Sequence, residues 1–141
     1  MLAAAVLNAF VAAFAGTWSC APDTGNARPA TRWTIAAVPR ATWARVTSTG
    51  RSGGTAYVGY LPYQGVWTYE DFRDDGTFVS TTSPGPQHGV WIWNGAVTTA
   101  DGITHVTVEW RRAGTTIRRA VGRSIGPSFR ASARDVCRAL P

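Results

Sequence analysis

The segment AGTWSC at residues 15–20 carries one of the two cysteines of this 141-residue chain, and DVCRAL at residues 135–140 carries the other. Cys20 and Cys137 therefore lie near opposite ends of a chain whose length is typical of one domain. Two thiols so far apart in sequence can meet only if the fold brings its first and last segments together. What lies between them decides whether it does.

Between the cysteines, runs rich in Trp, Tyr, Val, Ile and Thr alternate with clusters of Gly, Pro, Asn and Asp. This punctuation is typical of short strands joined by tight turns, and it predicts an all-β protein of about ten strands. The predicted turns include Asp-Gly at 75–76 and 101–102, Pro-Gly at 84–85, and the longer segments 24–31, 49–54 and 122–128. Connections this short join antiparallel neighbours, so we expect an up-and-down order.

About ten antiparallel strands in one domain are expected to close into a barrel, because closure removes exposed strand edges. In such a barrel the first and last strands are neighbours, so Cys20 and Cys137 would face each other at the closing seam. We expect a disulfide there, which chain-entropy arguments value at roughly 4–5 kcal/mol for so long a loop. Two free, buried thiols are the alternative. A disulfide would imply an oxidising compartment, so we expect a secreted or periplasmic protein.

Residues 2–14, LAAAVLNAFVAAF, place Leu2, Val6, Phe10 and Phe14 at a spacing of four. This period predicts a helix with one apolar face, which would cap one end of the barrel. The predicted organisation is thus a helix, or the remnant of a leader, at residues 1–15, and a single barrel at residues 16–141.

An alanine-rich helix running into Gly16-Thr17-Trp18, followed by meandering strands, resembles the lipocalin-like calycin barrels. The nearest resemblance is to secreted bacterial lipocalin-like and nitrobindin-like proteins. It implies that Trp18 is buried at the closed end of the barrel, beneath an arginine of the last strand. Three residues are candidates for that arginine: Arg130, Arg134 and Arg138.

The chain departs from nitrobindins in two places. Ser19, Cys20 and Ala21 stand where those proteins continue with a Gly-x-Gly motif, and no histidine lies near the C-terminus to hold haem. We therefore expect no cofactor.

The basic residues are fourteen arginines, which give a net charge of +6. Adjacent pairs such as Arg111–Arg112 and Arg118–Arg119 would point to opposite faces of a strand and would not build one basic stripe. The pattern argues against a nucleic-acid partner. No apolar run forces a membrane span, and we expect a monomer or a weak homo-oligomer.

Aromatic residues recur with period two, as in Trp67–Tyr69 and Trp91–Trp93, so each pair lies on one face of its strand. A barrel of ten strands leaves interior space unless such side chains fill it. We therefore expect a protein that binds a small apolar or aromatic molecule in the barrel. The candidate ligand-binding residues are Trp33, Tyr57, Trp67, Tyr69, His88, Trp91, Trp93 and His105.

Two other functions stay open. The barrel is an enzyme, such as an isomerase, a cyclase or a haem-dependent scavenger, if His88 or His105 acts on a substrate. It is a structural or interaction module if aromatic side chains fill it completely. No catalytic or metal-binding motif is present, which favours binding over catalysis.

Overall fold

The computed structural model describes residues 9–23, 30–50, 53–125 and 127–141. One helical segment, residues 9–14, precedes eleven strands. The strands are β1 (Gly16–Pro22), β2 (Thr31–Ala37), β3 (Trp43–Thr49), β4 (Gly54–Leu61), β5 (Val66–Arg73), β6 (Phe78–Ser83), β7 (Pro86–Gln87), β8 (Val90–Thr99), β9 (Gly102–Ala113), β10 (Thr116–Ile125) and β11 (Ser128–Ala139).

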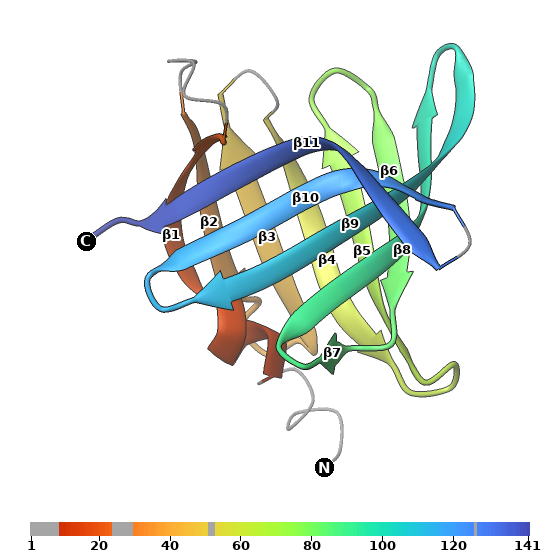
Figure 1. Cartoon of the computed structure of the whole chain (residues 1–141). Coiled ribbons are helices and arrows are strands. Elements are labelled where there is room, and N and C mark those ends of the chain that lie inside the picture. Colours follow the sequence, from red (N-terminus) through yellow and green to blue (C-terminus); the bar gives the residue numbers. More distant parts are fainter. Residues whose placement is uncertain (1–8, 24–29, 51–52, 126) are drawn as a thin grey trace.

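Every strand pairs with its sequence neighbours in antiparallel order, apart from the two-residue β7, which pairs only with β8. β6 pairs with β8, and β1 pairs with β11, so ten strands form a closed ring (Figure 1). The predicted fold class, an all-β up-and-down barrel of about ten strands, is confirmed.

The turns follow the chemistry expected of them. Gly76 has a φ of 87°, and the carboxylate of Asp75 accepts a hydrogen bond from the backbone N–H of Thr77 at 2.8 Å. The predicted turn at 122–128 is wrong in extent, because β10 continues through Ile125 and β11 begins at Ser128. The predicted turns at 24–31 and 49–54 include residues outside the described ranges.

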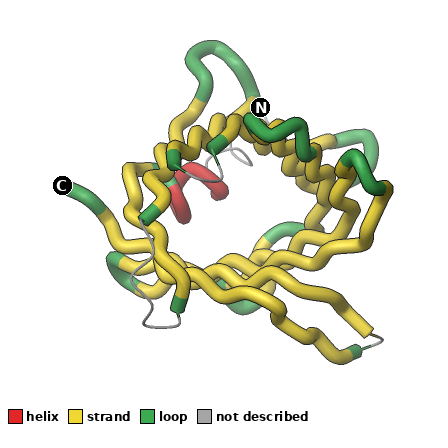
Figure 2. The backbone as a smooth tube through the Cα atoms, turned by 90° about the horizontal axis from the view of Figure 1, so that it is seen from above, coloured by secondary structure: helices red, strands yellow, loops and turns green. Residues whose placement is uncertain are grey.

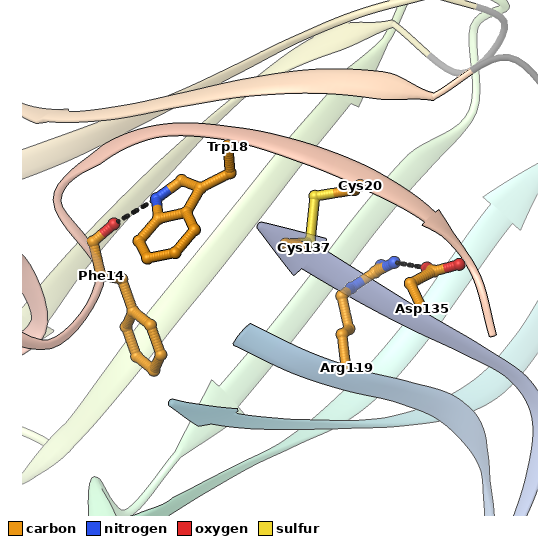
Figure 3. The surroundings of a disulfide bond; sticks show 6 residues. All are labelled: Phe14, Trp18, Cys20, Arg119, Asp135 and Cys137. Atoms are coloured by element: carbon orange, nitrogen blue, oxygen red, sulfur yellow. Dashed lines mark hydrogen bonds and ion pairs between the residues drawn. A yellow bond between two sulfur atoms is a disulfide. The ribbon is translucent and has the colours of Figure 1, made fainter. Parts of the chain in front are cut away.

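The seam between β1 and β11 carries the predicted disulfide. Cys20 lies directly opposite Cys137, and their sulfurs are bonded across 117 residues of sequence (Figure 3). Cys20–Cys137 is the third of the five residue pairs between β1 and β11, which run from Trp18–Ala139 to Pro22–Asp135. It therefore joins the two ends of the meander at the middle of their contact.

The helical segment lies inside the ring at one end of the barrel (Figure 2), which we call the helix end. Phe10 and Phe14 are fully buried there, as the predicted apolar face requires. Ring centres of four tryptophans lie between 5.5 and 6.3 Å from that of Phe10: Trp67, Trp91, Trp93 and Trp110. The part of the predicted helix at residues 2–8 lies outside the described residues.

Trp18 is buried at this end, as predicted, and its Nε1 donates to the carbonyl oxygen of Phe14 at 2.9 Å (Figure 3). The arginine over its ring is Arg112 of β9, with Cζ 5.3 Å from the ring centre. The expectation of an arginine from the last strand is wrong, because Arg130, Arg134 and Arg138 are all exposed on β11. Arg112 reaches the helix end because β9 finishes there, and its Nη1 donates to the carbonyl of Ala13.

Candidate ligand-binding site

An internal cavity of about 60 Å³ lies beyond the aromatic cluster of the helix end. Trp93 and Trp110 contact Phe10 and also line this cavity, so they form its floor. The remaining lining residues come from five strands and are Tyr69, Asp71, Arg73, Val79, Thr81, Val97, Val106, Val108, Arg119 and Val121. Half of the barrel is thus filled by aromatic side chains, and the other half retains a space with both apolar and charged walls.

Charged side chains line this space because two strands continue their inward-facing stripe into polar residues. In β5 the stripe that begins with Trp67 and Tyr69 reaches Asp71 and Arg73. Arg73 Nε donates to Asp71 Oδ2 at 3.1 Å, and the Asp71 side chain is only 14% exposed.

A second ion pair comes from the strands beside the seam. Arg119 of β10 donates through Nη1 to Asp135 Oδ2 of β11 at 3.1 Å (Figure 3). Its guanidinium lies over the ring of Trp33, with Cζ 5.0 Å from the ring centre. The Arg119 side chain is 14% exposed, so this charge is held inside the barrel by a carboxylate and an aromatic face.

The electrostatics of the cavity favour neutral forms of its acidic groups. Burial raises the pKa of the Tyr69 hydroxyl above its usual range, and the Asp71 carboxylate raises it further. Burial also raises the pKa of Asp71, and this outweighs the opposing effect of the Arg73 and Arg119 charges. The phenol therefore keeps its proton at neutral pH and can donate a hydrogen bond.

A wider depression of about 610 Å³ adjoins the cavity, and Val97, Val106 and Val121 line both spaces. It forms where β10 leaves the barrel wall. β9 pairs with β10 only as far as Thr107–Gly122, although β8 and β9 stay paired to Gly102. The β10–β11 hairpin continues to Ile125–Ser128 and projects from the ring in Figure 2. The wall is therefore open beside the cavity.

The eight sequence-predicted residues fall into three groups. Tyr69 and Trp93 line the cavity. Trp67 and Trp91 pack in the aromatic cluster of the helix end, and Trp33 is half-buried against Trp110, beneath Arg119.

The other three lie away from the inner cavity. Tyr57 is 39% exposed on β4, and His88 occupies the exposed turn between β7 and β8 with a φ of 52°. His88 and Gly89 both have positive φ, as the two central residues of a tight hairpin require. His105 is exposed and lines the outer depression.

Sequence reasoning missed four charged residues of this site: Asp71, Arg73, Arg119 and Asp135. A signal existed for the first two, because they share parity with Trp67 and Tyr69. Arg119 shares parity with the apolar Ile117 and Val121, which marks it as the inward member of the pair Arg118–Arg119.

Among the described residues, no cluster of three metal-ligating side chains occurs, and no helix is long and apolar enough to cross a bilayer. No protein-family model matches the chain, and no curated protein matches it. The disulfide is typical of an oxidising, extracytoplasmic compartment.

Proposed function

We propose that this chain is a secreted or periplasmic, lipocalin-like binding protein that holds a small apolar or aromatic molecule inside its barrel. The cavity bounded by Tyr69, Trp93 and Trp110 carries the proposal. Concave sites with mostly apolar walls and a few convergent polar groups are where proteins bind small molecules.

The dimensions limit what the site accepts. The inner cavity of about 60 Å³ holds a small chemical group. A larger ligand would extend past Val97, Val106 and Val121 into the adjoining depression. The gap between β9 and β10 gives such a ligand a lateral route of access.

Binding is favoured over catalysis by the positions of the histidines. His88 lies in a hairpin turn and His105 on an outer wall, and neither lines the inner cavity. The ionisable groups that do line it are engaged in ion pairs or, in the case of Tyr69, held protonated.

A matched pair of variants tests the proposal. Val97→Phe would fill the junction between the cavity and the depression, whereas Thr98→Phe adds the same ring to the exposed face of the same strand. Tryptophan emission is followed while a panel of indole, naphthalene, fatty acids, retinol and haem is added to each, with folding checked by urea unfolding.

We expect saturable quenching by at least one ligand in the wild type and in Thr98→Phe, and at least about tenfold weaker binding in Val97→Phe. Equal binding by folded Val97→Phe would place the ligand elsewhere. No saturable quenching by any compound would favour a filled structural barrel.

A further inference from the structure

Two buried hydrogen-bond donors of the cavity have no acceptor among the described residues. They are Nε1 of Trp93, whose side chain is 1% exposed, and Nε of Arg119. Both residues line the cavity. Trp18 shows how the same fold satisfies an indole elsewhere, by donation to the carbonyl of Phe14. Unpaired buried donors are uncommon in native proteins, and they mark places where an acceptor is expected.

The Arg119 guanidinium is held in place before any ligand arrives. Asp135 binds Nη1, and the Trp33 ring lies against the guanidinium plane. Because the guanidinium plane is already fixed, a ligand that binds it does not have to order the arginine side chain. The buried Nε then remains a charged donor without an acceptor among the described residues.

Apart from Asp71, Arg73, Arg119 and Thr81, the wall is apolar, with five valines and the rings of Tyr69, Trp93 and Trp110. A ligand that suits this wall has an apolar or aromatic body and one group with two acceptor oxygens. A carboxylate is such a group, and its charge complements the arginine.

We therefore propose that the ligand is a small carboxylic acid with an apolar or aromatic body, whose carboxylate lies between Trp93 Nε1 and Arg119 Nε. This inference rests on the proposed function and specifies the chemistry of its ligand. The body would point toward Val97, Val106 and Val121, where the cavity meets the depression.

Benzoate and benzamide provide the test, because they share one shape and differ in charge and in acceptor number. Calorimetric titrations would compare both probes on the wild type, Arg119→Gln and Arg118→Gln. Arg118 is the matched control, since it loses the same charge from the opposite face of β10, where its side chain is 62% exposed. Because Arg119→Gln leaves Asp135 unpaired and can unfold the barrel, Trp93→Phe serves as a second variant that removes one donor and keeps a ring.

We expect benzoate to bind at least about tenfold more tightly than benzamide, because charge-assisted hydrogen bonds are the stronger ones. Arg119→Gln should weaken benzoate binding at least about tenfold, and Trp93→Phe should weaken it about threefold. Arg118→Gln should change benzoate affinity less than about twofold.

Two outcomes would overturn the inference. Equal binding of both probes, or benzoate binding unchanged in folded Arg119→Gln and Trp93→Phe, would mean that water satisfies the two donors and the ligand is neutral. In that case the proposed small-molecule binding function stands if the neutral compounds of the panel bind. If no compound binds at all, this function and the inference both fail.

Discussion

Arg112 lies over Trp18 at the helix end, and Arg119 lies over Trp33 beside the cavity, with Cζ atoms 5.3 and 5.0 Å from the ring centres. Arg112 donates through Nε and Nη1 to two backbone carbonyls, those of Gly114 and Ala13. Arg119 donates to one carboxylate and keeps a buried Nε without an acceptor among the described residues.

The tryptophans differ in the same way. The indole N–H of Trp18 donates a hydrogen bond to the backbone of the helical segment, whereas the N–H of Trp93 has no acceptor among the described residues. One half therefore satisfies its polar groups internally, which suits a closed core. The other half keeps donors, charges and space, which suits a binding site.

The largest effect on stability should come from loss of the disulfide that closes the barrel. Replacing Cys20 and Cys137 by alanine should lower the free energy of unfolding by roughly 4–5 kcal/mol, because the bond closes a loop of 117 residues. Urea unfolding of the oxidised wild type and the double variant measures this. A loss below about 1 kcal/mol would mean that the β1–β11 pairing alone closes the barrel.

Trp18→Ala should cost about 3–5 kcal/mol, as truncation of a buried aromatic residue does. The same urea experiment measures it, and Trp43 on the outer wall of β3 supplies a half-buried tryptophan for comparison. If Trp18→Ala costs less than about 1 kcal/mol, the packing of Trp18 at the helix end contributes little to the stability of the barrel.

Arg112→Gln should cost about 1–2 kcal/mol, from two charged hydrogen bonds and one cation–π contact at a partly solvated site. Its neighbour Arg111 is exposed and points to the opposite face of β9, so Arg111→Gln should stay within about 0.5 kcal/mol of the wild type. Equal effects of the two substitutions would show that net charge, and not contact with the helical segment, sets the stability.

The smallest expected effect is on how stability depends on pH, which should differ between buried and exposed carboxyl groups. The pKa of Asp71 is raised from 3.8 by burial, so the folded state holds this proton more tightly than the unfolded chain. The contribution of Asp71 to stability is therefore greatest below pH 3.8 and is lost as the pH rises through the raised value. Unfolding of Asp71→Asn across this range should show the variant gaining on the wild type as pH rises.

The contribution of Asp75 to stability should change with pH in the opposite direction. Its pKa is lowered by hydrogen bonds from Thr77, so its contribution is present above pH 3.8 and is lost as the pH falls. A wild type whose difference from Asp71→Asn does not change with pH would show that Asp71 is not buried in solution.

The helix end was the half that sequence reasoning predicted well. Strand number followed from turn spacing, the disulfide from up-and-down order, and the burial of Trp18 from a family resemblance. Those features depend on local chemistry or on order along the chain. The arginine over Trp18 was predicted wrongly, because a long side chain reaching across the end of a barrel depends on where β9 finishes.

The cavity half was harder to predict because its chemistry depends on which face of each strand points inward. Asp71 stands in a run of acidic residues near a turn, and its burial becomes evident only when parity is carried along β5 from Trp67. Arg119 meets Asp135 through the pairing of β10 with β11, which no local pattern specifies.

The most direct test of the difference between the two halves is a ¹⁵N–¹H spectrum of the indole N–H groups during a benzoate titration. The chain has seven tryptophans, and Trp18→Phe and Trp93→Phe would assign the two signals that matter. We expect saturating benzoate to shift the Trp93 signal downfield and to leave the signal of Trp18, whose N–H donates to Phe14, in place. A shift of Trp18 with Trp93 unmoved, or no shift of either at saturation, would contradict this expectation.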